Sequence, residues 1–110
     1  MAFTPGDSHG VTAGATPVTV VAAPVAATQR ELKTLTVYNA DTAIRTLTFR
    51  KNLGGGVTRN VCVVDLDVGD NFVWNDVIGL SDVAHSLEIL LDGAVTTNEL
   101  PFTSTFADLT

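Results

Sequence analysis

The chain has 110 residues and a mass of 11.5 kDa, which is enough for one hydrophobic core and too little for two. Hydrophobic residues make up 45% of it and charged residues only 16%, so the composition excludes an intrinsically disordered chain. The net charge is −6, and all six Lys and Arg residues precede position 60 while nine carboxylates follow it. This excess of negative charge disfavours nucleic acid and anionic membranes and favours a protein partner.

Neither a membrane span nor a secretory signal is predicted. The longest apolar stretches, Val18–Ala27 and Val83–Leu91, fall far short of the roughly 20 residues that a membrane helix needs. Met1–Gly10 has no basic segment followed by an apolar one, so we expect synthesis and retention in a cytosol. The single cysteine, Cys62, cannot form an internal disulfide, and its place between two valines is typical of a buried reduced thiol.

The first part of the chain divides into an arm and a domain. Residues 1–16 are rich in Gly, Ser, Thr, Pro and Ala and lack apolar periodicity, so they are predicted to form an extended N-terminal arm outside the core. Residues 17–110 are predicted to form the folded domain. Thr16–Ala23 is a β-branched run that indicates a strand, and Pro24–Gln29 is a plausible corner after it.

Two alternating segments follow. Leu32–Tyr38 places Leu35 and Val37 on one face, and Ile44–Lys51 places Leu47 and Phe49 on one face, with threonines opposite in both segments. Asn39–Thr42 lies between them and has the composition of a turn. The sequence therefore predicts that these two strands pair as an antiparallel hairpin with threonine-rich outer faces.

The next strands are predicted from their turns. Asn52–Gly56 supplies positions for positive φ, after which Val57–Leu66 returns as a strand beside the previous one. Asp67–Asn71 is a second turn, before a short Phe72–Trp74 strand whose Trp74 is expected to cover one end of the core. An irregular segment extends from there to Asp82.

The last third of the chain predicts one clear strand and an ambiguous tail. Val83–Leu91 places Val83, His85, Leu87, Ile89 and Leu91 on one face, and Asp92-Gly93 is a hairpin signal before a strand over residues 94–97. The tail from Asn98, with Phe102 and Phe106, is either a last strand or an arm that docks its aromatic rings on a neighbour.

These elements define the predicted fold class. It is all-β, with no segment that favours helix, and consists of about six to eight short strands. We expect a single antiparallel β-sandwich, jelly-roll or immunoglobulin-like, or a small barrel, with the extended N-terminal arm attached.

Three features resemble ligand sites and are explained better by structure. Asp65, Asp67 and Asp76 fit positions of a calcium-binding EF-hand loop, but Asp70 stands where that loop requires glycine, so a solvated acidic turn is the better interpretation. His9 and His85 have no second ligand at metal spacing.

The third feature is Gly54-Gly55-Gly56, which lacks the Lys and Ser/Thr of a phosphate-binding loop and is predicted to be a hairpin loop. No serine lies in a nucleophile motif, and Cys62 has no helper residue nearby. The sequence therefore predicts no enzyme, no cofactor and no metal.

The segment Leu35–Phe49, LTVYNADTAIRTLTF, resembles a recurring strand, turn and strand of small virion proteins of tailed bacteriophages. Val18–Ala27 is similar to the Ala/Pro/Val strand that precedes this segment in such proteins, and Ser86–Gly93 to a later Ser-Leu-Glu strand that ends in a Gly turn. The resemblance covers Pro17–Thr97 and implies a β-sandwich component of a virion.

Among such components, the size fits a capsid decoration (cement) protein, made in the cytoplasm of the bacterial host and bound to the outer surface of the head, where it stabilises the shell. The resemblance implies the major capsid protein as partner and self-association as a homotrimer, without nucleic acid or membrane. Eight residues in the arm, the basic strands and the tail are the candidates for partner contacts: Phe3, Thr4, Pro5, Arg45, Arg50, Lys51, Phe102 and Phe106.

Two alternatives remain at this stage. One is a neck, tail or fibre-adaptor protein of the virion. The other is a carbohydrate- or ligand-binding module, although Trp74 and Tyr38 are the only Trp and Tyr available for an aromatic platform. The separation of basic and acidic residues along the chain is either used for docking or serves only to keep the surface solvated.

Overall fold

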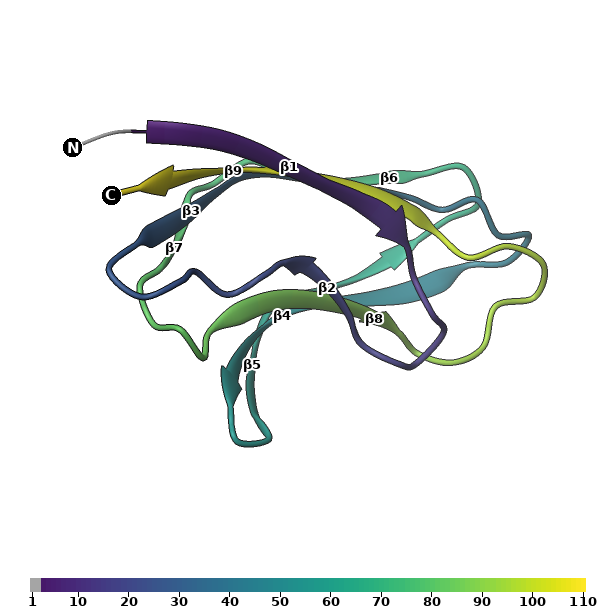
Figure 1. The fold of residues 1–110 in the computed structure, drawn as a ribbon. Helices are drawn as coiled ribbons and strands as arrows, with labels where there is room; N and C mark the ends of the chain where they lie inside the picture. The colour runs from purple at the N-terminus through teal and green to yellow at the C-terminus, as the bar shows by residue number, and fades with distance from the viewer. Residues whose placement is uncertain (1–2) are drawn as a thin grey trace.

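In the computed structural model, which describes residues 3–110, the chain forms two β-sheets packed face to face (Figure 1). The described residues contain no helix that is long and apolar enough to span a membrane. The strands are β1 (Phe3–Val11), β2 (Val18–Val21), β3 (Gln29–Tyr38), β4 (Arg45–Gly54), β5 (Val57–Leu66), β6 (Asn71–Trp74), β7 (Ile78–Leu80), β8 (Ser86–Leu91) and β9 (Pro101–Leu109).

The strand order is that of a jelly roll. One sheet has the order β1-β9-β3-β6, with β7 also pairing with β3, and the other has the order β2-β8-β4-β5. Every pairing between strands is antiparallel. When β6 and β7 are counted as one interrupted strand, the two sheets have four strands each. Successive strands alternate between the sheets except at the β4–β5 hairpin, as in double Greek-key sandwiches. The all-β sandwich predicted from the sequence is confirmed, and of its two forms the jelly roll is the one observed.

The core is built from the alternating faces that the sequence predicts. Leu35 and Val37 of β3 and Leu47 and Phe49 of β4 are all fully buried. The Phe49 ring meets the rings of two β6 residues edge to face, with centroids 6.3 Å from Phe72 and 5.7 Å from Trp74. Because β4 and β6 belong to opposite sheets, these contacts join the two layers.

The predicted hairpin between Leu32–Tyr38 and Ile44–Lys51 is wrong, although both strands exist. β3 pairs with β9, β6 and β7, whereas β4 pairs with β5 and β8 in the other sheet. The segment from Asn39 to Ile44 is therefore a corner between sheets. The alternation of apolar residues does not distinguish the two cases, because a strand in either sheet buries one face against the same core.

The predicted hairpin at Asp92-Gly93 is also wrong. No strand forms over residues 94–97; this segment crosses from β8 to β9 in the opposite sheet. The buried face of β8 is confirmed for Leu87, Ile89 and Leu91, but the strand begins only at Ser86 and the side chain of Val83 is 60% exposed. The chain turns before Ser86 because the Asp82 carboxylate accepts a hydrogen bond from the backbone N–H of Ala84, at 2.8 Å.

The segment predicted to be a free arm forms an edge strand. Phe3–Val11 pairs with β9 over its whole length, although none of its side chains enters the buried core. Gly6 and Gly10 make this pairing possible, since a Cβ atom there would lie 2.6 Å from the ring of Phe106 and 3.1 Å from that of Phe102. Residues 3–11 therefore belong to the sandwich that was predicted to start at residue 17, while residues 1 and 2 of the predicted arm lie outside the described residues. The structure shows the tail as β9, in the middle of the sheet.

Candidate interaction surfaces

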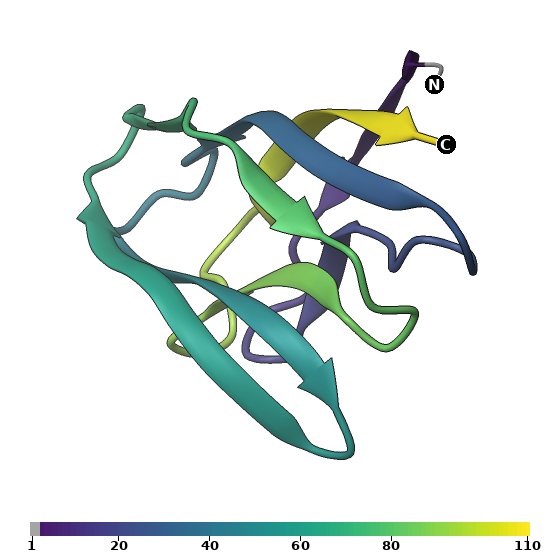
Figure 2. The same cartoon turned by 90° about the vertical axis from the view of Figure 1, so that its left-hand side faces the viewer.

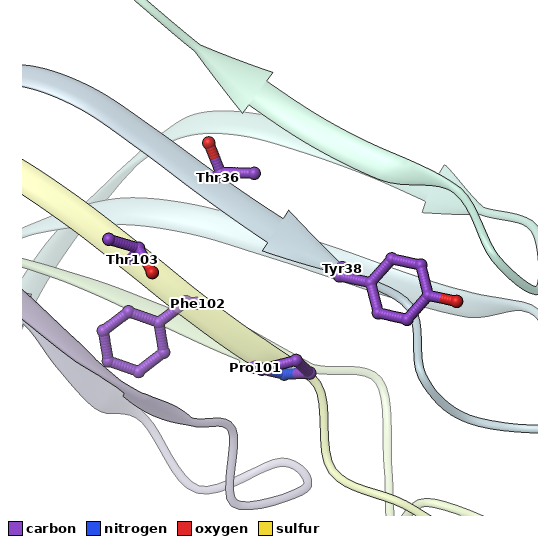
Figure 3. Close-up of a pocket in the computed structure, with 5 residues that line it drawn as sticks. All are labelled: Thr36, Tyr38, Pro101, Phe102 and Thr103. Carbon is purple, nitrogen blue, oxygen red and sulfur yellow. The ribbon is translucent and has the colours of Figure 1, made fainter.

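Two shallow hollows lie on the described surface. One, of about 170 Å³, is lined by Thr36, Tyr38, Pro101, Phe102 and Thr103 on β3 and β9 (Figure 3). Another, of about 310 Å³, lies at the opposite end of the same strands, beside Gln29 and Leu109. Both are open to solvent, whereas a site for a small ligand encloses most of its surface. The candidate functional site is therefore a set of surfaces rather than a cleft.

Residues singled out as possible metal ligands lie apart. Among residues 3–110, no group of three or more His, Cys, Asp or Glu side chains is placed to hold a metal ion. His9 lies on edge strand β1, while the imidazole Nε2 of His85 is 4.0 Å from the carboxylate of Asp82. Cys62 is a partly buried free thiol on β5, where the sequence predicts a buried one.

The most strongly perturbed ionisable group, Asp41, holds the corner between β3 and β4. Its carboxylate is fully buried and accepts hydrogen bonds from the backbone N–H groups of Thr96 (2.9 Å) and Thr97 (2.7 Å) and from Nε of Arg45 (2.7 Å). Burial by itself would raise the pKa of Asp41, but these donors outweigh it and hold the pKa well below its usual range. The group is therefore a structural anion that ties two loops together.

Four of the six basic residues are neutralised within the fold. Arg30 pairs with Asp108, and this hydrogen-bonded contact of 2.6 Å lowers the pKa of Asp108. The other three pairs are Lys33 with Glu31 (3.0 Å), Arg45 with Asp41 (2.7 Å), and Arg50 with Glu88 (2.7 Å). Lys51 and Arg59 make no ion pair with any described residue.

Those two remaining cations lie opposite each other on the β4–β5 hairpin. The strand register pairs Lys51 directly with Arg59, next to the glycine loop at which the hairpin turns. Gly54, Gly55 and Gly56 all have positive φ, which confirms the loop predicted there. Figure 2 shows this hairpin extending beyond the rest of its sheet. We call Lys51, Arg59 and the exposed Val57 the hairpin tip.

An acidic turn lies at the other end of β5. Asp67 and Asp70 flank the tight turn between β5 and β6, and both are exposed. Neither carboxylate makes an ion pair with a described residue. Between them, the side chain of Val68 is 57% exposed. We call Asp67, Val68 and Asp70 the acidic corner.

The outer face of the β1-β9-β3-β6 sheet carries rows of threonine with apolar residues at its two ends. Thr34 and Thr105 are cross-strand partners with hydroxyl oxygens 2.6 Å apart, and Thr36 pairs with Thr103 beside them. Phe3, 62% exposed, marks one end of the sheet. Tyr38, Val73 and Val11 are exposed at the other end. These exposed apolar residues leave both ends of the face available for a contact.

Only some of the eight predicted contact residues are exposed and free of ion pairs within the described residues. Phe3, Thr4 and Pro5 are exposed on β1, and Lys51 is half-buried without an ion pair. Arg45 and Arg50 are held by buried carboxylates.

The two tail aromatics also serve the fold. Phe102 is 5% exposed and belongs to the core, which corrects the expectation that it docks on a neighbour. The ring of Phe106 is half-buried, with the guanidinium of Arg30 4.5 Å from its centroid.

The sequence interpretation missed Arg59 as a contact candidate. A signal for it exists: counting outward from the triple glycine places Arg59 opposite Lys51, as the structure does. It also missed the buried role of Asp41, because the two N–H donors that Asp41 binds lie more than fifty residues further along the chain.

Comparisons with known proteins identify the fold and no family. No family model matches the chain, and no curated protein matches its sequence. A solved chain from Bacillus endospore appendages, described as a novel family of disulfide-linked pili, is similar with a TM-score of 0.55 and 14% identity over 99% of this chain and 87% of that one.

A chain from the structure of infectious bursal disease virus, Gx strain, is similar with a TM-score of 0.54 and 19% identity. The match covers 97% of this chain but 30% of the virus chain. At such identities the likeness is one of fold. This β-sandwich is thus shared with a chain from a virus particle and with a chain from a pilus.

Proposed function

We propose that this chain is a structural protein of a virus particle, and more narrowly a capsid decoration (cement) protein on the outer surface of a bacteriophage head. The observation that carries the proposal is the jelly-roll sandwich that it shares with a chain of a virus particle. The resemblance of Leu35–Phe49 to virion proteins of tailed bacteriophages supports the narrower form.

The surface supports an architectural role. Exposed apolar residues lie at both ends of the threonine-rich outer face of the β1-β9-β3-β6 sheet. We propose that Phe3, Thr4 and Pro5 at the β1 edge contact the major capsid protein. Burying such apolar area stabilises a complex by about 25 cal/mol per Å² before ordering costs. Many copies with such contacts, arranged as homotrimers, would clamp a shell without any chemistry.

A second structural role is favoured by a specific observation. The pilus chain is matched over 87% of its length, so a whole subunit of a filament has about the same extent as this domain. This supports the alternative of a neck, tail or fibre-adaptor subunit that assembles in rings or stacks. A disulfide-linked filament is not proposed, since one cysteine per chain, Cys62, can join two copies at most.

We do not propose an enzyme or a carbohydrate-binding module. Trp74 packs edge to face on Phe49, and its indole N–H donates to the backbone oxygen of Asp76 at 3.0 Å, so it is used within the fold. Tyr38 alone, beside the hollow of Figure 3, offers no platform of two rings for a sugar.

The proposal predicts that the purified protein binds bacteriophage shells assembled without it and raises their melting temperature. Phe3→Ser should weaken binding about tenfold or more, because an exposed ring then loses its burial on the shell. Val25→Ser, which changes a 70% exposed side chain in the β2–β3 loop, is the control and should bind as the wild type does. Co-sedimentation measures both affinities. Shells that neither bind the protein nor gain thermal stability would contradict the decoration role.

A further inference from the structure

The hairpin tip has an arrangement that costs the isolated chain stability. Lys51 and Arg59 are directly opposed across β4 and β5, where like charges repel each other. They are also the two basic side chains that no described carboxylate neutralises, in a chain of net charge −6. An uncompensated cation pair at the end of a projecting hairpin is suited to carboxylates from outside the subunit.

The carboxylates of Glu88 and Asp82, which lie close to the hairpin tip, already accept hydrogen bonds from groups of the same chain. Glu88 is buried and accepts hydrogen bonds from Arg50 and from the side-chain amide of Asn52, both at 2.8 Å. The neighbouring turn contacts the hairpin, since a Cβ atom on Gly54 would lie 3.1 Å from Cβ of Ala84. In this turn the carboxylate of Asp82 accepts a hydrogen bond from the backbone N–H of Ala84 and lies 4.0 Å from Nε2 of His85.

The acidic corner has the complementary composition. The tip offers two cations and Val57, which is 49% exposed; the corner offers the carboxylates of Asp67 and Asp70 around Val68, which is 57% exposed. Tip and corner lie at opposite ends of β5, about 30 Å apart at roughly 3.3 Å per residue, so one copy cannot bring its own two surfaces together.

We propose that the hairpin tip of one copy docks on the acidic corner of a second copy, with Lys51 and Arg59 bound by Asp67 and Asp70 and the two valines in contact. The contact is heterologous, because it joins two different patches of identical chains. Such a contact forms a ring when the rotation between copies closes and a filament when it does not. The inference supplies the contact for the self-assembly in the proposed function; closure after three copies would give the homotrimer.

Charge reversal tests the contact without any shell present. Two double variants are made: one carries Lys51→Glu and Arg59→Glu, and the other carries Asp67→Lys and Asp70→Lys. Each gives the hairpin tip and the acidic corner charges of the same sign. Each double variant should weaken self-association at least about tenfold relative to the wild type, as measured by sedimentation velocity in about 0.05 M salt. Combining all four substitutions keeps the net charge of −6 and should restore association to near the wild-type level.

Several results would overturn the proposal. They are a wild type that remains monomeric at every concentration, double variants that associate as the wild type does, and a fourfold variant that stays dissociated while its melting temperature matches the wild type. If the wild type is monomeric and Lys51→Glu with Arg59→Glu loses binding to shells instead, the tip docks on the shell and not on a second copy. Failure of the tip-to-corner contact would not contradict the decoration role, because that role is tested separately by the binding of the protein to shells.

Discussion

The Asp41→Asn variant is expected to melt about 10 °C or more below the wild type. The N–H groups of Thr96 and Thr97 bind different oxygens of the carboxylate, so an amide, which has one oxygen acceptor, would leave one of them facing a donating nitrogen. Arg45, whose side chain is 13% exposed, would lose its buried charged partner and keep only the more distant carboxylate of Asp92, at 3.8 Å. Circular dichroism during heating measures the change.

Asp65→Asn is the matched control. Asp65 is exposed on β5 and accepts one hydrogen bond, from the hydroxyl of Thr46 at 2.6 Å. Its replacement should shift the melting temperature by no more than about 3 °C, as is usual for surface positions. Equal shifts in the two variants would show that Asp41 does not anchor the corner.

The difference in stability between the wild type and the Asp41→Asn variant is expected to depend on pH. The pKa of Asp41 is lowered in the native state, so its stabilising effect is fully present above the unfolded-state pKa of about 3.9 and declines as the pH falls toward the lower native value. The difference in unfolding free energy between wild type and Asp41→Asn should therefore be constant near neutral pH and become smaller below about pH 4. Asp108, whose pKa is also lowered, is present in both proteins and cancels in the difference.

Phe49→Ala should lower the free energy of unfolding by about 3–5 kcal/mol. The ring is fully buried and meets Phe72 and Trp74 of the opposite sheet, so truncation opens a cavity between the two layers. Urea denaturation measures the loss. Val63→Ala, at a 54% exposed position on the adjacent strand, is the control and should change stability by no more than about 0.5 kcal/mol. A loss below about 1 kcal/mol in Phe49→Ala would contradict the packing of this ring between the sheets.

The sequence predicts which side of each strand is buried, but it does not predict which strands pair. The inward positions Leu35, Val37, Leu47 and Phe49 follow from an alternation of period two, which is a local property. Pairing depends on distant segments: in β3, Leu35 lies opposite both Ser104 and Trp74. The strong turn composition at Asn39–Thr42 therefore indicated a hairpin where the chain passes between sheets.

The first strand escaped prediction for a different reason. β1 joins the sheet through its backbone and buries no large side chain, so hydrophobic periodicity gives no signal. Its two inward glycines have a purpose only once the rings of Phe102 and Phe106 are in place. A Gly-rich segment that pairs in this way has the same composition as a free arm.

Candidate contact residues were predictable only in part. Charge alone marked Arg45, Arg50 and Lys51 as equivalent, but the fold gives the first two buried carboxylate partners, Asp41 and Glu88. Glu88 comes from a neighbouring strand that no spacing in the sequence reveals, and Asp41, although only four residues before Arg45, is buried by a corner that only the fold shows. The pair of Lys51 with Arg59 follows from counting equally outward from Gly55, and the structure reaches this register through a bulge between Asn52 and Gly54.

The copy number of this polypeptide relative to the major shell protein, measured by quantitative mass spectrometry of purified particles, tests the central proposal most directly. A decoration protein that covers the head predicts about one copy per shell subunit. About a dozen copies or fewer per particle would contradict the decoration role and place the protein in a ring at the neck or tail.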